Sequence, residues 1–223
     1  MDHLLVFADI ETDGLGADKI LQIGAVTDQG QEFNVYINPK RDLPLSCTNL
    51  CGLYYFKNQL YRDGIRLPSV GVITAIRMFK TWVESLGKPV TMVFHNGFAF
   101  DCHVLAKYFI KFKVVPPTNI TKMCDTLPVF RKHLVDAELA NHRLTTLAAY
   151  FEIDFIYAHD ALQDSIILKS VCYKAALKID RPLEELLNEH QKSVEYFIEK
   201  EHSRNELKLR PVQTAVSLSV LKE

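Results

Sequence analysis

The stretch HLLVFADIETDG, residues 3–14, sets an apolar run directly before a series of carboxylates. An unbroken apolar run of this kind is typical of a strand that is buried in a sheet. Side chains two positions apart on a strand point to the same face, so Asp9 and Glu11 are expected to project together from its end. Two carboxylates on one face repel each other unless a cation lies between them. A strand end with solvated acids would give the same pattern, so this motif alone leaves both interpretations open.

A second motif, FHNGFAFD at residues 94–101, has a similar layout. It begins where the apolar run 90–94 ends, and that run predicts a central strand covered on both faces. A turn follows and brings Asp101 to or near the start of a helix that is expected over residues 101–112. Asp101 is therefore either a helix N-cap or a further member of the acidic cluster.

The third motif is YAHDALQD at residues 157–164. Asp164 falls inside a helix that is expected over residues 159–177, with Leu162 and Ile166 as apolar neighbours. Burying an unpaired carboxylate is costly, so Asp164 needs a partner. His159 lies near the helix start, five residues earlier, and can reach the same space from a different angle. A lone surface histidine is the alternative.

The remaining pattern predicts a sheet of mixed direction. Two further strands joined by a hairpin link follow the first, and helices then alternate with short strands, as in an α/β fold. Residues 40–68 look irregular, basic and rich in tyrosine, and residues 203–223 carry no strong pattern. The expected strands lie at residues 3–9, 20–27, 31–37, 90–94 and 122–127, and the expected helices at residues 70–85, 101–112, 144–151, 159–177 and 182–202.

The composition is that of a soluble globular protein. Of the 223 residues, 48% are hydrophobic and 24% are charged, which argues against disorder along most of the chain. No apolar run comes near the roughly 18 residues that a membrane helix needs, and the apolar start lacks the basic flank of a signal peptide. Five irregularly spaced cysteines argue against a disulfide scaffold and favour reduced thiols inside the cell.

Charge is distributed unevenly along the chain. Residues 40–135 hold 14 basic and 5 acidic residues, a net charge of +9, between acidic ends of net −6 and −4. A basic middle of this kind is compatible with a phosphate-binding face beside a carboxylate cluster. Solvated lysines and arginines on helix faces are the alternative.

Together, the three motifs resemble those of the DEDDh 3′–5′ exonucleases, the DnaQ-like branch of the ribonuclease H-like fold. Their order and rough separations match, over about residues 3–178. A sister branch places a tyrosine four residues before the final acid; this chain has Asp160 there and His159 five before, so it resembles the histidine branch. Within the family it looks most similar to the three-prime repair exonucleases, and it also resembles the exonuclease-like C-terminal region of promyelocytic leukaemia protein isoforms and their fish relatives. Further matching positions are Gly24, Thr48, Gly52, Leu53, 125–127 and 144–148.

The resemblance implies an α/β fold with a mixed five-stranded sheet flanked by helices. It implies an exonuclease domain at residues 1–178, and a C-terminal helix and tail at residues 179–223 that pack on this domain or extend from it. It further implies substrate contacts after the first motif and in the second, made by Ile10, Thr12, Gly14, Leu15 and Asn96.

The resemblance also assigns the chemistry. It implies two Mg²⁺ ions, for which Mn²⁺ can substitute, and hard cations of this kind prefer carboxylate oxygens. Asp9, Glu11 and Asp164 would bind the first ion, and Asp101 would help to hold the second. His159 would be the general base toward water, which suits the near-neutral pKa of imidazole.

The function so implied is metal-dependent 3′–5′ hydrolysis at DNA 3′ ends, with single strands preferred and nucleoside monophosphates released. The expected partner is a DNA 3′ end or else an RNA 3′ end, with no membrane. The expected location is intracellular, with the nucleus ahead of the cytoplasm. Two alternatives stay open. One is an exonuclease that acts mainly on RNA. The other is a silent fold used as an interaction module, whose signature would be a damaged acidic set, whereas all five positions are intact here.

Overall fold

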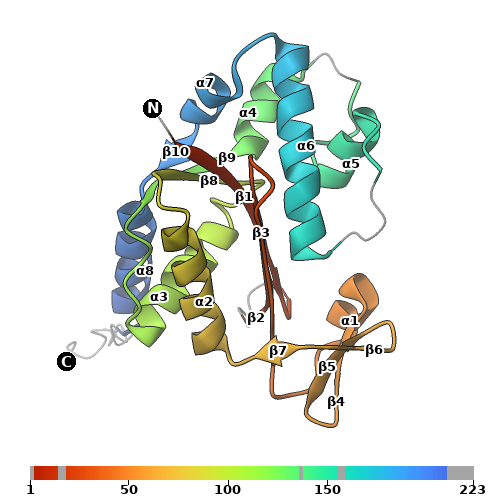
Figure 1. Cartoon of the computed structure of the whole chain (residues 1–223), viewed down its shortest axis with the longest axis vertical. Helices are drawn as coiled ribbons and strands as arrows, with labels where there is room; N and C mark the ends of the chain where they lie inside the picture. Colours follow the sequence, from red (N-terminus) through yellow and green to blue (C-terminus); the bar gives the residue numbers. More distant parts are fainter. Residues whose placement is uncertain (1–2, 15–18, 136–137, 155–158, 210–223) are drawn as a thin grey trace, which may run out of the picture.

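A computed structural model describes residues 3–14, 19–135, 138–154 and 159–209. Its main sheet has seven strands in the order β10-β9-β8-β1-β2-β3-β7 (Figure 1). The five longer ones are β1 (Leu4–Thr12), β2 (Ile20–Thr27), β3 (Glu32–Ile37), β8 (Val90–Phe94) and β9 (Ile120–Asp125). A two-residue strand extends each edge: β7 (Ser69–Val70) and β10 (Gln191–Lys192). The predicted mixed five-stranded sheet is thus confirmed, with a short addition on either side.

Strand direction changes at β1, in the middle of the sheet. β1 pairs antiparallel with β2, which pairs antiparallel with β3, whereas β1, β8 and β9 run parallel. The antiparallel half follows from the hairpin link at residues 28–30, and the parallel half from the helical connections that precede β8 and β9. The carboxyl ends of β1, β8 and β9 therefore meet at one edge of the sheet.

Helices cover both faces of the sheet (Figure 1). Alternate residues of β1 face the two sides: Leu4 and Val6 belong to one apolar core, and Leu5 and Phe7 to the other. The first core is closed by α2 (Val72–Ser85), α3 (Asp101–Phe112) and α8 (Val194–Leu209). The second is closed by α4 (Thr126–His133), α5 (Leu144–Tyr150), α6 (Ala161–Ile179) and α7 (Leu183–Asn188).

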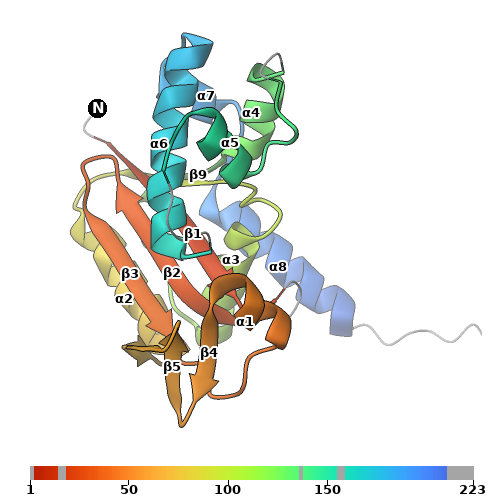
Figure 2. The same cartoon turned by 90° about the vertical axis from the view of Figure 1, so that its right-hand side faces the viewer.

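Residues 45–67 form a small unit of their own, so the expectation of irregular structure there is wrong. A short helix, α1 (Leu45–Cys51), precedes a three-stranded antiparallel sheet, which we call the accessory sheet: β4 (Leu53–Phe56), β5 (Gln59–Arg62) and β6 (Ile65–Leu67). Both of its two-residue turns have positive φ, at Lys57-Asn58 and Asp63-Gly64, as tight hairpins require. Figures 1 and 2 place this unit beside the N-terminal end of α6.

The single helix predicted over residues 182–202 is also wrong. Two helices, α7 and α8, are separated there by β10, which pairs with β9, and α8 continues to Leu209. α8 packs on α3, where Nδ1 of His103 lies 2.9 Å from Oε1 of Glu201. The proposed division of the chain at residues 178 and 179 stays a prediction. Among the helices of the described ranges, none is long and apolar enough to cross a membrane.

Candidate active site

β1 carries the first two acids within its hydrogen-bonded length. Asp9 pairs with Gly24 and Glu11 with Gln22, so both acids lie within the strand. The sequence predicts instead that they project from the end of the strand. The alternation of the strand places Ile10 between them, buried in the core on the opposite face. The sheet itself therefore holds the two carboxylates side by side.

Asp101 reaches this strand from the helix on the other side. It is the first residue of α3, while Phe100 occupies the N-cap position, so the N-cap alternative for Asp101 is not observed. The Asp101 side chain is buried, and its Oδ1 accepts a hydrogen bond from the backbone N–H of Ile10 at 3.1 Å. That bond fixes the acid of the second motif directly against the first.

A further buried acid, Asp125, holds the loop that leads to Asp101. Its carboxylate accepts hydrogen bonds from the backbone N–H groups of Asn96 at 2.8 Å and Phe98 at 3.0 Å. It also caps α4 by accepting from the N–H of Leu127 at 3.0 Å. Asn96 takes a positive φ of 63°, which this double anchor supports. The sequence matched Asp125 to the family without indicating this role.

The third motif lies at the beginning of α6. Asp160 is the N-cap, and its Oδ1 accepts from the N–H groups of Leu162 and Gln163. Asp164 follows in the first turn, where its Oδ2 accepts from the backbone N–H of His159 at 3.1 Å. His159 has a φ of 67°, in the left-handed region that residues other than glycine rarely adopt.

These elements bring the predicted catalytic residues to one cavity of about 400 Å³. Polar side-chain atoms of Glu11, His159 and Asp164 all lie within 4.8 Å of one another, and Nδ1 of His159 is 3.9 Å from Oε1 of Glu11. The His159 side chain is 40% exposed, so it stands at the mouth of the cavity. The lining residues are Asp9, Ile10, Glu11, His95, Asn96, Phe100, Asp101, Arg143, Leu144, Thr145, His159 and Asp164.

The four acids of the cavity hold their protons unusually well. Burial and the charges of Asp101 and Glu11 raise the pKa of Asp9 well above its ordinary value. Burial also raises the pKa of Glu11 to about 7, that of Asp101 to about 7, and that of Asp164 to about 6. Burial lowers the pKa of His159, so its imidazole is neutral at physiological pH.

This donor set fits a hard divalent cation. Carboxylates crowded in a buried site repel one another, and their raised pKa values show that the protein supplies too little positive charge to balance them. Mg²⁺ and Mn²⁺ prefer oxygen ligands of this kind. Asp9, Glu11, Asp101 and Asp164 are the residues that would hold such ions.

The predicted substrate contacts are divided. Asn96 and Ile10 line the cavity, and the Ile10 side chain also belongs to the apolar core. Thr12 and Gly14 follow at the end of β1 without lining it, and Leu15 lies outside the described residues. Arg143 and Thr145, to which sequence reasoning gave no role, line the cavity from the start of α5. The sequence matched 144–148 to the family, and that was the available signal.

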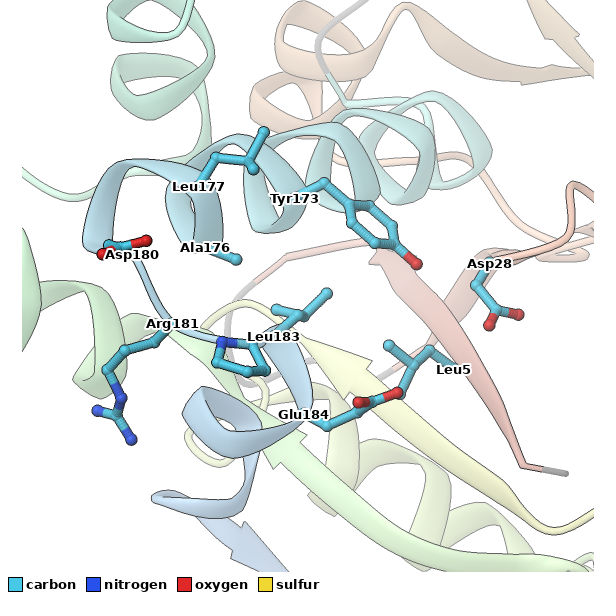
Figure 3. Close-up of a pocket in the computed structure, with 10 residues that line it drawn as sticks. Leu5, Asp28, Tyr173, Ala176, Leu177, Asp180, Arg181, Leu183 and Glu184 are labelled. Carbon is cyan, nitrogen blue, oxygen red and sulfur yellow. The ribbon is translucent and has the colours of Figure 1, made fainter. Parts of the chain in front are cut away.

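Another cavity, of about 440 Å³, lies at the opposite end of β1 (Figure 3). Tyr173 and Ala176 of α6 lie opposite Leu183 and Glu184 of α7, with Asp28 to one side. Its acids are spread around an apolar floor instead of being gathered with a histidine. The smaller cavity, with its clustered acids, is therefore the candidate active site.

Comparison with known proteins finds relatives among exonucleases and DNA polymerases. The RNase_T exonuclease family matches residues 67–171. The DNA polymerase III PolC-type protein of Bacillus subtilis (strain 168) is 31% identical over 170 residues, which is 74% of this chain and 11% of that protein. The PolC-type protein of Caldanaerobacter subterraneus subsp. tengcongensis is 28% identical over 78% of this chain and 12% of its own length. These matches support a DEDDh-type exonuclease.

Solved structures agree with a ribonuclease H-like exonuclease fold. Exonuclease I superposes with a TM-score of 0.63 at 18% identity, over 84% of this chain and 43% of that one. E. coli exonuclease I with a dA16 oligonucleotide gives 0.62 at 18%, and a zinc-bound complex with single-stranded DNA gives 0.62 at 17%. The chain spans about a tenth of its PolC-type relatives and two fifths of exonuclease I. The nearer resemblance to three-prime repair exonucleases and promyelocytic leukaemia protein stays a prediction.

Proposed function

We propose that this protein is a divalent-metal-dependent 3′–5′ exonuclease that acts on single-stranded DNA ends and releases nucleoside monophosphates. The observation that carries the proposal is the meeting of Asp9, Glu11, Asp101, Asp164 and His159 at one open cavity. The relatives support DNA as the substrate, because they are named as DNA polymerases and exonuclease I is described with single-stranded DNA.

Asp9, Glu11 and Asp164 would bind one Mg²⁺ ion, and Asp101 would help to hold a second, with Mn²⁺ as a substitute. Such ions supply a Lewis acid for the phosphoryl oxygens and offset the charge that develops during the displacement. The buried carboxylates keep these positions fixed through the sheet and through the bond from Ile10 to Asp101.

His159 is the proposed general base. Its neutral imidazole can accept a proton from the attacking water, because burial keeps the pKa of the ring below its ordinary value. The ring is partly exposed at the mouth of the cavity, where water and substrate enter. Its Nδ1 faces Glu11 at 3.9 Å, which orients it toward the acids without embedding it among them.

The strand end would be held at the rim of the cavity. Ile10 and Thr12 lie on β1, Gly14 follows that strand, and Asn96 lines the cavity from the opposite loop. Leu15 is proposed as a further contact because it comes next in the sequence. Arg143 adds a cation to the same lining, where a phosphate of the substrate would offset its charge.

The test uses DNA and RNA single strands of one sequence, labelled at the 5′ end, with Mg²⁺, Mn²⁺ or excess chelator. We expect stepwise shortening of the DNA from its 3′ end, loss of cleavage in chelator, and loss of cleavage in Asp9→Ala and Asp164→Ala. Glu184→Ala, an exposed acid on α7, is the matched control and should cleave normally.

Three results would redirect the proposal. Faster shortening of RNA would make RNA the substrate. Undiminished cleavage in chelator would overturn the metal-dependent mechanism. Failure to shorten either strand with either metal would indicate a silent fold that serves as an interaction module.

A further inference from the structure

A single arginine connects the accessory sheet to the catalytic histidine. Arg62 is the last residue of β5, and its side chain is only 13% exposed. Its Nη1 donates to Oδ2 of Asp160, the N-cap of α6, in a buried ion pair. Its Nη2 donates to the backbone carbonyl of His159 at 3.2 Å. One guanidinium therefore contacts two consecutive residues of the third motif.

The carboxylate of Asp160 is the centre of this network. Its Oδ2 also accepts from the hydroxyl of Tyr36 at 2.8 Å and from Nε2 of Gln22 at 3.1 Å, while its Oδ1 caps α6. Burial opposes the charge, but these hydrogen bonds and the Arg62 guanidinium together lower the pKa of Asp160. The anion is thus stable, and it ties β2, β3, β5 and α6 together at the entrance to the catalytic helix.

The His159 backbone is held at both of its polar groups. Its N–H donates to Asp164, and its carbonyl accepts from Arg62. The residue has a φ of 67°, in a backbone region that residues other than glycine rarely adopt. A conformation of this kind persists only where surrounding contacts enforce it. Of the two contacts, the one from Arg62 comes from outside the motif.

We propose that Arg62 is a positioning residue that sets the orientation of His159 through the His159 carbonyl, so that the accessory sheet takes part in assembling the active site. This inference rests on the proposed function for its kinetic consequence, but the orientation of His159 has a readout of its own. The bidentate shape of the guanidinium is the essential property, because it serves the Asp160 carboxylate and the His159 carbonyl at once.

Arg62→Lys separates positioning from stability. A lysine ammonium can keep the charge opposite Asp160, but it lacks the rigid fork that reaches both acceptors. Arg62→Met removes both contacts and keeps the apolar stem. Arg77→Met, an exposed arginine of α2 on the other side of the sheet, is the matched control. Each variant is assayed for kcat and KM on a single strand, for melting temperature, and for the gain in melting temperature on adding Mn²⁺.

We expect kcat to fall about 10- to 100-fold in both Arg62 variants, the size that a misplaced catalytic group produces. KM and the Mn²⁺-induced gain in melting temperature should change less than twofold, because the carboxylates stay in place. Arg62→Lys should melt close to the parent and still lose kcat. If Arg62→Lys keeps full kcat, or if kcat in both variants falls only in step with melting temperature, Arg62 is merely structural.

NMR signals from the histidine rings of the folded protein give a readout that does not depend on activity. In the parent, the His159 ring, assigned with His159→Ala, should give one sharp resonance. In Arg62→Lys it should shift or broaden while the other histidines stay unchanged, and in Arg77→Met it should not move. An unshifted, sharp His159 signal in Arg62→Lys overturns the inference even if the parent cleaves no strand, whereas an inactive parent overturns only the proposed function.

Discussion

The four acids of the cavity make the metal-free protein sensitive to pH in an unusual direction. Asp101 and Asp164 titrate near 4 in an unfolded chain, whereas in the folded protein their pKa values are raised to about 7 and about 6. Between these limits the folded state binds more protons than the unfolded state, so its stability falls as the pH rises. The penalty is absent below about pH 4 and complete above about pH 7.

Asp101→Asn should therefore stabilise the metal-free protein at pH 7.5 and leave it unchanged near pH 4. The melting temperature in chelator, measured across this range for parent and variant, checks the difference. Adding Mg²⁺ should raise the melting temperature of the parent more than that of the variant, since ions that bind only the folded state shift the folding equilibrium. A variant that melts below the parent at pH 7.5 would mean that Asp101 is not repelled there.

His159→Ala tests the division of roles between the base and the acids. If the imidazole only accepts a proton, its loss should slow cleavage by about 10²–10⁴-fold and leave the metal-induced gain in melting temperature nearly intact. Asp164→Ala should lose both cleavage and the metal-induced gain in melting temperature. The two variants are compared at saturating Mn²⁺, and a His159→Ala protein that loses its response to metal would make the histidine a ligand.

The structure brings together the residues that sequence reasoning grouped, and their roles stay predictions. The period of two along a strand was enough to pair Asp9 with Glu11, and the family resemblance of the three motifs added Asp101, His159 and Asp164. Sequence reasoning missed Arg62, Asp125 and Arg143 as parts of the site. Each of these acts across a long stretch of chain, through the carbonyl of His159, the loop at residues 95–100, or the wall of the cavity. Contacts of that kind have no local signature.

At the scale of elements, the close approach of β2 and α6 fixes the third motif. A Cβ atom on Gly24 would lie 2.2 Å from backbone atoms of Ala161 and Leu162, and Ser165 donates to the Gly24 carbonyl at 3.1 Å. The start of α6 can sit this near the sheet only because position 24 has no side chain.

Gly24→Ala should push the start of α6 away from β2 and take His159 and Asp164 with it. We expect a loss of at least about 2 kcal/mol in the free energy of unfolding, as overpacking against rigid backbone produces, together with a large loss of cleavage. Gly71→Ser is the control, since a Cβ there meets open space and φ is −68°. Denaturant unfolding measures the stability of both variants. If Gly24→Ala is as stable as the parent, α6 can shift freely.

Elements with a long, clean period were predictable, and short ones were not. The apolar spacing of α2 and α3 and the run of β8 matched the structure closely. The strands at residues 53–67 are three or four residues long, and tight turns hold them together, so their alternation is too brief to detect. The last predicted helix was divided because residues 191–192 pair with β9, a tertiary contact that overrides helical propensity.

At the scale of the molecule, the basic middle of the chain predicts how substrate binding responds to salt. Residues 40–135 carry a net charge of +9 and supply α1 to α4 together with the accessory sheet. If these cations meet phosphates, each contact releases counterions from the strand. Basic residues elsewhere on the surface would have no such effect.

The affinity of the inactive Asp164→Ala variant for a fluorescent single strand should therefore fall steeply from 50 to 200 mM salt. Three phosphate contacts would give a log–log slope of about −2. Fluorescence anisotropy at several salt concentrations measures the slope. A flat response would place these cations away from the strand, and a matched uncharged polymer should show no binding.

The acids come from distant parts of the chain, and this has a consequence for biosynthesis. Asp9 is made early on β1, Asp101 belongs to a helix of one layer, and Asp164 is made late, in the opposite layer. A nascent chain on the ribosome lacks the last acid and His159 until α6 is synthesised. It then completes the site only when both layers have closed on the sheet. A newly made copy of this protein therefore has no means of cutting nucleic acid until translation has passed α6 and both halves of the fold are in place.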